Sequence, residues 1–170
     1  GWIHFQKKEY SQAIDQYNNV ISKYPKTKLE PILYYSIGDA YFNMEKYDLA
    51  IENYEKVISQ FPSSQYVFDA VTGIQYSYVA KGDPEKAVSF LDEFVYKNPS
   101  LSYADQLMFK KGEIYYSLRQ YDKAKKEFTE LKWPNTNGII FESDLETYGR
   151  FNKAKYFELA AADFLKYNTN

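Results

Sequence analysis

The sequence predicts an all-α protein, a solenoid of stacked helix-turn-helix hairpins. Three observations lead to this fold class. The same residue types recur about every 37 residues, the apolar positions inside each unit follow the period of a helix, and a proline ends each of the first three units. A single hairpin of this kind cannot bury its apolar face alone, so successive hairpins are expected to stack around a continuous core.

The repeat is clearest in three columns of positions. Small residues recur at intervals of 37, 37, 37 and 36, at Ala13, Ala50, Ala87, Ala124 and Ala160. Four residues after each alanine stands a large side chain: Tyr17, Tyr54, Leu91, Phe128 and Phe164. The units end at Pro25, Pro62 and Pro99. Because a small residue faces large neighbours, Ala50 and Ala87 are predicted to be buried where two helices touch.

Helical spacing inside the units gives the expected elements. In the second unit Tyr34, Ile37, Gly38 and Tyr41 share one helix face, and the residues from Tyr47 to Phe61 repeat the pattern. In the third unit Asp83 is expected to cap a helix that begins at Pro84. The predicted helix pairs are 31–44 with 48–61, 66–81 with 84–97, and 103–118 with 122–132.

The repeats are expected to fill residues 1–134, as four hairpins of which the first lacks part of its first helix. From 135 to 170 the pattern fades into a loop, followed over 141–167 by a degenerate fifth hairpin or one capping helix. The chain begins at Gly1 without a Met, and one period back from Pro31 leaves seven residues missing. We therefore expect the sequence to be a piece of a longer protein.

These columns resemble the tetratricopeptide repeat family, and the second unit matches its pattern with Tyr34, Ile37, Gly38, Tyr41, Tyr47, Ala50, Tyr54 and Pro62. The departures are a period longer than the usual 34 or so, Gln75 in place of a glycine, and an early end at Pro134. The resemblance implies a right-handed superhelix whose first helices line a concave groove, and a protein-interaction scaffold. The long links after Tyr-Pro and Phe-Pro are similar to those of periplasmic bacterial repeat proteins of outer-membrane assembly and the Tol-Pal system. This second likeness favours the bacterial periplasm or the periphery of the outer membrane.

Composition and charge argue against several other classes of function. The net charge is −2, which does not favour a nucleic-acid partner, and no cysteine is present for disulfides or thiolate metal sites. No apolar run approaches the roughly 18 residues of a membrane span, so we expect no membrane insertion by this sequence.

No catalytic, cofactor or metal site is predicted. The single histidine, His4, is expected to be packed or half-packed. Acidic residues such as Asp92, Glu93, Glu127 and Glu130 are interpreted as solvated charges, and so is a basic cluster of Lys110, Lys111, Lys123, Lys125 and Lys126.

The groove that the resemblance implies has an aromatic and acidic lining. Its expected residues are Trp2, Phe5, Tyr35, Asp39, Phe42, Tyr76, Phe109, Glu113 and Tyr116, with Thr72 and Val79 beside them. They predict a protein or peptide partner with apolar anchors and a Lys or Arg to meet Asp39 and Glu113. A homo-oligomer is compatible with the sequence. Two alternatives stay open: a module for glycans or other ligands, supported only by the 19 tyrosines, and the interaction region of a larger enzyme or assembly.

Overall fold

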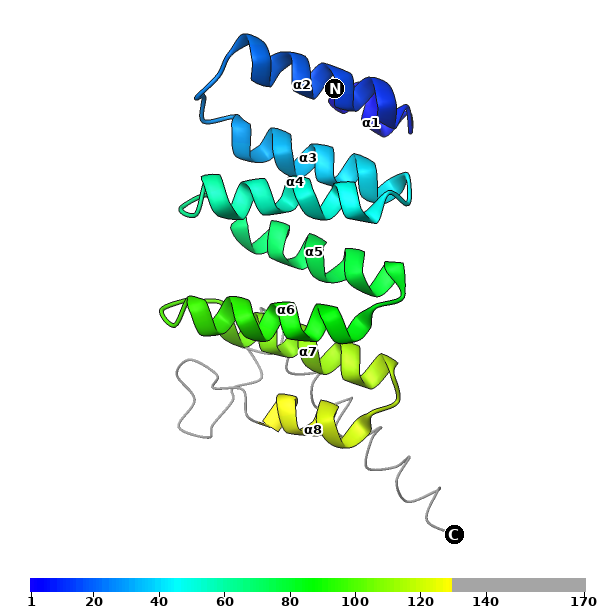
Figure 1. Ribbon diagram of the computed structural model, residues 1–170, viewed down its shortest axis with the longest axis vertical. Coiled ribbons are helices and arrows are strands. Elements are labelled where there is room, and N and C mark those ends of the chain that lie inside the picture. The colour runs from blue at the N-terminus through cyan, green and yellow to red at the C-terminus, as the bar shows by residue number, and fades with distance from the viewer. Residues whose placement is uncertain (130–170) are drawn as a thin grey trace, which may run out of the picture. The chain divides into compact units, whose positions relative to one another are not determined.

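The computed structural model describes residues 1–129, which form eight helices and no strand (Figure 1). The chain divides into two compact units, Gly1–Glu93 and Phe94–Asn170. The helices are α1 (Trp2–Gln6), α2 (Tyr10–Lys23), α3 (Glu30–Asn43), α4 (Tyr47–Gln60), α5 (Val67–Lys81), α6 (Pro84–Lys97), α7 (Ala104–Ser117) and α8 (Tyr121–Thr129). The all-helical fold predicted from the repeat is confirmed for this part of the chain.

The predicted helix bounds from α3 to the start of α8 agree with the structure to within one residue. At α6, the backbone amide of Lys86 donates to the Asp83 carboxylate at 3.2 Å, so Asp83 caps the helix that begins at Pro84, as the sequence predicts. The predicted end of the last helix at 132, and the loop with a fifth hairpin or capping helix over 135–170, lie outside the described residues.

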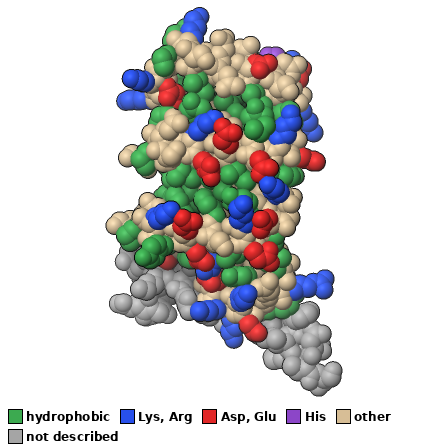
Figure 2. Space-filling model, viewed as in Figure 1, with side chains coloured by type: hydrophobic (Ala, Val, Ile, Leu, Met, Phe, Trp, Pro, Cys, Tyr) green, Lys and Arg blue, Asp and Glu red, His purple; other side chains and the backbone are tan. Residues whose placement is uncertain are grey.

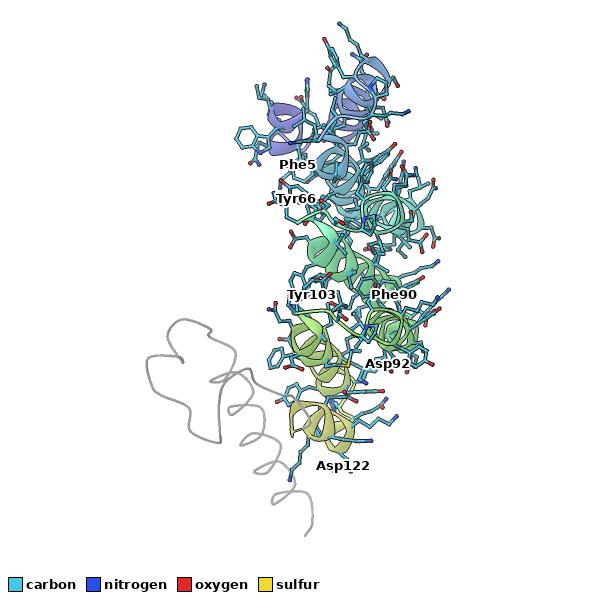
Figure 3. All side chains as sticks on the ribbon, turned by 90° about the vertical axis from the view of Figure 1, so that its left-hand side faces the viewer. Phe5, Tyr66, Phe90, Asp92, Tyr103 and Asp122 are labelled. Atoms are coloured by element: carbon cyan, nitrogen blue, oxygen red, sulfur yellow. The ribbon has the colours of Figure 1, made fainter. Side chains whose placement is uncertain are left out.

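The first unit consists of two layers of helices. Contacts run from α1 to α2, α2 to α3, α3 to α4 and α4 to α5, and α3 also touches α5 directly. Figure 3 shows α1, α3 and α5 on one side, with Phe5 and Tyr66, and α2 and α4 on the other. We call the surface formed by α1, α3 and α5 the first-helix face.

The turn between the two helices of a hairpin is the same four times over. Lys8, Glu45, Gly82 and Arg119, each 37 residues apart, all adopt a positive φ of 59° to 89°. The amide of the following residue donates at 2.9 Å to a carbonyl five residues earlier, as in Lys46 to Tyr41. This is the Schellman ending of a helix, which turns the chain back on itself. A shared turn explains why the hairpins repeat in register although only one of the four turn residues is glycine.

Alanines allow the close approach of helices throughout the repeat. Ala13, Ala50 and Ala87 are fully buried, and Ala124 is 1 % exposed. The predicted burial of Ala50 and Ala87 is therefore confirmed. Ala13 belongs to a core cluster with Ile37, and Ala50 belongs to a second cluster with Ile74.

The ring of Tyr54 lies between two glycines from successive hairpins. A Cβ on Gly38 of α3 would stand 2.5 Å from the Tyr54 ring, and a Cβ on Gly73 of α5 would stand 2.6 Å from it. Both distances are below any real contact, so only glycine fits at either position with the ring in place. In the third repeat the Gly38 and Tyr54 columns hold Gln75 and Leu91, both buried, so the larger residue is accompanied by a smaller partner.

The second unit contains an ion pair at a position predicted to be solvated. Lys111 of α7 and Glu127 of α8 are joined at 2.9 Å, and their side chains are only 10 % and 13 % exposed. The expectation of a solvated charge is wrong for these two residues. The reason is that Lys111 occupies the column of Ile37 and Ile74, which is buried in the core of the earlier repeats.

Candidate functional site

A pocket of about 170 Å³ opens between α3 and α5 on the first-helix face. Its lining comes from three helices of two successive hairpins: Tyr35, Asp39 and Phe42 of α3, Tyr54 of α4, and Asp69, Thr72, Gly73 and Tyr76 of α5. We call it the α3–α5 pocket. All of its residues belong to the first unit.

Helical spacing explains how the pocket is assembled. Tyr35, Asp39 and Phe42 stand at i, i+4 and i+7 of α3 and so share one face of that helix. Asp69, Thr72 and Tyr76 stand at i, i+3 and i+7 of α5, so they share one face of that helix. Together with the α3 face they line the pocket. The pocket thus brings together four predicted groove residues, Tyr35, Asp39, Phe42 and Tyr76, and Thr72 beside them.

Asp39 is the partly buried acid of the pocket. The hydroxyl of Tyr54 donates to its Oδ1 at 2.6 Å. Burial raises the pKa of the Asp39 carboxyl, hydrogen bonds from Tyr54 and Tyr35 lower it, and the negative charge of Asp69 raises it again; the net shift is upward. Asp39 is therefore a carboxylate held away from water and close to a second negative charge.

Tyrosine rings form the wall around this carboxylate. The centroid of the Tyr35 ring lies 5.6 Å from that of Tyr54 and 6.1 Å from that of Tyr66, on which the ring stacks. Burial, followed by the charge of Asp39, raises the pKa of both Tyr35 and Tyr54. Both hydroxyls therefore stay neutral donors at neutral pH, and the packed rings hold the wall in one arrangement.

The pocket is negative, because its lining carries two carboxylates and no Lys or Arg. Within residues 1–129, neither Asp39 nor Asp69 takes part in an ion pair. Asp69 is exposed, and Tyr76 keeps 46 % of its surface in solvent. A ligand would therefore meet one exposed ring, one exposed acid and one shielded acid.

The remaining predicted groove residues do not line this pocket. In α1, Trp2 is 68 % exposed, and Phe5 packs edge-on against Tyr10 at 5.4 Å. In the second unit, Phe109 is 6 % exposed and packs with Ala124, so the expectation of an accessible ring is wrong there. The ring faces the partner helix instead of solvent.

Two other predicted groove residues of the second unit contact side chains that are close to them in sequence. Glu113 lies 3.5 Å from Lys110, and Tyr116 packs edge-on against Tyr121 at 5.4 Å. In the first unit, His4 is half-exposed and its Nδ1 lies 2.6 Å from Glu9, which agrees with the expectation of a half-packed histidine.

Sequence reasoning missed three lining residues. Tyr54 was assigned to the core alone, and nothing in its column indicates that the hydroxyl reaches the pocket. Gly73 lies outside the glycine column. Asp69 had a usable signal, because it stands three residues before Thr72 and seven before Tyr76 on one helix face.

Metal-ligand groups and membrane-spanning helices are both absent from the described residues. Residues 1–129 contain no group of three or more His, Asp or Glu side chains that could hold a metal ion. Every helix in this part of the chain is too short or too polar to span a bilayer.

Comparison with protein families gives the assignment. Tetratricopeptide repeat models match residues 1–27, 31–64 and 105–131, which together cover about half of the chain. The chain belongs to the tetratricopeptide repeat family, and its fold is the α-solenoid of helical hairpins. Repeats of this family generally mediate protein–protein interaction and are typically non-catalytic.

A solved structure agrees with the α-solenoid fold. A tetratricopeptide repeat protein from Parabacteroides merdae ATCC 43184 superposes with a TM-score of 0.64 at 17 % identity, over 94 % of this chain and 55 % of that one. This chain thus spans about half the length of that protein. MamA AMB-1 gives a TM-score of 0.49 at 22 % identity, over 98 % of this chain and 88 % of that one. No curated protein sequence matches the chain significantly.

Proposed function

We propose that this chain is a protein-interaction module that binds a peptide segment of a partner across the first-helix face, centred on the α3–α5 pocket. The observation that carries the proposal is the pocket itself, where aromatic and acidic side chains from two successive hairpins converge. A lining drawn from two repeats suits an extended or helical segment that runs across them.

The composition of the pocket favours a protein ligand. Aromatic side chains supply a large contact area at little entropic cost and dominate interface energetics. Tyr35 is already held by Tyr54 and Tyr66, so binding would not have to order it. Tyr76 adds an exposed ring at the rim.

The opposite layer of the first unit has a different character. Figure 2 shows charged side chains of both signs interspersed over α2 and α4. Two of them pair as Lys56 with Glu52 at 3.1 Å, and Asp48 pairs with Lys81 of α5 at 2.5 Å. A surface of mixed charge, part of which is already paired, offers less to a partner than the pocket does.

Selection from a random peptide library displayed on phage, followed by fluorescence polarisation with the selected peptides, tests the proposal. The variant carrying Phe42→Ala and Tyr76→Ala should weaken binding about tenfold or more, because these substitutions remove ring contact area at the pocket. Helicity by circular dichroism should be retained, since Phe42 and Tyr76 are not fully buried.

The matched control is a variant on the other layer, Glu52→Ala with Lys56→Ala, which should bind like the wild type. Lys123→Ala, Lys125→Ala and Lys126→Ala together provide a second control in the second unit. If the selected peptides bind the aromatic variant normally and lose affinity for either control, recognition lies elsewhere and the proposal is wrong.

A further inference from the structure

We infer that the α3–α5 pocket receives a cationic side chain of the partner, a Lys or an Arg, between the carboxylates of Asp39 and Asp69 and beside the rings of Tyr35 and Tyr76. The inference rests on the proposed function, since it specifies which residue of a bound peptide enters the pocket.

Charge complementarity is the first argument. The lining holds two acids and no base, and neither acid has an ion-pair partner within residues 1–129. The acids lie close enough for the charge of Asp69 to raise the pKa of the Asp39 carboxyl. A cation placed between them would relieve their mutual repulsion and replace the water that Asp39 has lost.

The hydrogen-bond geometry leaves room for such a ligand. The Tyr54 hydroxyl donates to Oδ1 of Asp39, and Tyr35 also hydrogen-bonds to this carboxylate. A carboxylate has about four acceptor positions, so Asp39 retains acceptor capacity for a charged N–H group. Lys offers three donors and Arg five, so either has enough donors for both carboxylates.

The aromatic wall adds attraction for a cation. Tyrosine faces attract ammonium and guanidinium groups within about 6 Å of the ring centre. This chain uses the same contact elsewhere: Lys56 lies 5.6 Å from the Tyr34 ring, and Lys86 lies 5.2 Å from the Tyr78 ring. The rings of the pocket provide that chemistry beside the two carboxylates.

Size favours one side chain over a larger ligand. Pockets for drug-sized molecules measure about 300 to 1,000 Å³, and this pocket is about 170 Å³. It suits the end of one long side chain. A metal ion fits less well, because residues 1–129 contain no group of three or more ligating side chains.

Oriented peptide libraries test the inference directly. Four synthetic nonamer libraries would be compared on the immobilised chain, with random flanks and a fixed central Lys, Arg, norleucine or Glu. We expect the Lys and Arg libraries to bind about tenfold more strongly than the norleucine library, which corresponds to about 1.4 kcal/mol. The Glu library should bind most weakly, and the preference should shrink as salt rises.

Substitutions then assign the preference to the pocket. Asp39→Asn with Asp69→Asn should bring the ratio of Lys or Arg to norleucine close to one while norleucine peptides still bind. Asp69→Asn alone, at an exposed position, should lower the ratio without a folding defect. The control Glu52→Gln, an exposed acid on α4, should leave the ratio unchanged.

The outcomes separate the two proposals. If all four libraries bind and the Phe42→Ala/Tyr76→Ala variant loses them, but Lys and Arg have no advantage over norleucine, the cation inference is overturned and the proposed function stands. If the preference survives both aspartate substitutions, the cation binds elsewhere and the inference also fails. If no library binds, both proposals fail.

Discussion

The hydroxyl of Tyr54 on α4 donates a 2.6 Å hydrogen bond to the Asp39 carboxylate on α3. Tyr54 is 2 % exposed and belongs to a core cluster, and its hydroxyl meets Asp39 in the lining of the α3–α5 pocket. The bond therefore links a core side chain of the second-helix layer to the first-helix face. Substitutions at Tyr54, Gly73 or Asp39 should change stability and the pocket together.

Tyr54→Phe removes that hydrogen bond and leaves the ring in place. A hydrogen bond to a charged group contributes about 1.5 to 3 kcal/mol, and we expect a loss near the lower end, because Asp39 is only partly buried. Urea denaturation followed by circular dichroism measures the change. Tyr96→Phe, at a side chain that is 87 % exposed, is the control. Equal midpoints for both variants would show that the bond contributes nothing to the free energy of unfolding.

Asp39→Asn should stabilise the chain at neutral pH. Burial raises the pKa of the Asp39 carboxyl in the folded state above the unfolded value of about 3.9. Between these two pKa values the folded state binds more protons than the unfolded state, so the free energy of unfolding falls as pH rises through this window and is level above it. Asn carries no such charge and still offers a carbonyl to Tyr54. The stability gain of the variant should be present at pH 7 and shrink towards pH 4, and a gain independent of pH would contradict this account.

Gly73→Ala should destabilise the chain although alanine favours helices. The added Cβ would stand 2.6 Å from the buried Tyr54 ring, and overpacking of this kind costs about 1 to 3 kcal/mol. The gain in helix propensity, about 1 kcal/mol at most, offsets only part of that. In a Tyr54→Leu background, which copies Leu91 of the third repeat, the same substitution should become neutral or stabilising. If Gly73→Ala still lowers stability in the leucine background, the loss does not come from a clash with the Tyr54 ring.

Glu45→Gly should stabilise the turn between α3 and α4. Glu45 has a φ of 59°, while Gly82 holds the equivalent position in the next hairpin with a φ of 89°. A residue with a side chain in the left-handed backbone region costs about 1 to 2 kcal/mol. Glycine avoids this strain but loses more conformational entropy on folding, which offsets part of the gain. We expect a gain of about 0.5 to 1 kcal/mol in thermal or urea unfolding. The reciprocal variant, Gly82→Ala, should lose stability, and a Glu45→Gly variant no more stable than wild type would refute the argument.

The sequence was sufficient for the fold and for part of the pocket. Equivalent positions in successive hairpins pack against equivalent neighbours, so a fixed period indicates which positions are buried. The helix bounds and the burial of Ala50 and Ala87 could therefore be predicted from the period. Tyr35, Asp39 and Tyr76 followed from helical spacing. A period does not report where one hairpin departs from its neighbours. The reach of the Tyr54 hydroxyl depends on Gly38 and Gly73 together, and the burial of Phe109 depends on contacts particular to the fourth hairpin.

Lys111 and Glu127 are another departure of the fourth hairpin from its neighbours. Their 2.9 Å ion pair joins α7 to α8 with side chains 10 % and 13 % exposed. Glu127→Gln should lower the free energy of unfolding by about 3 to 5 kcal/mol, because it removes the negative charge of a largely buried ion pair. Replacing both residues by those of the third repeat, Lys111→Ile with Glu127→Phe after Ile74 and Phe90, should be neutral or stabilising. Urea unfolding of both variants decides the matter: if the double variant is less stable than the single one, the pair is required for this hairpin and the apolar pair cannot replace it.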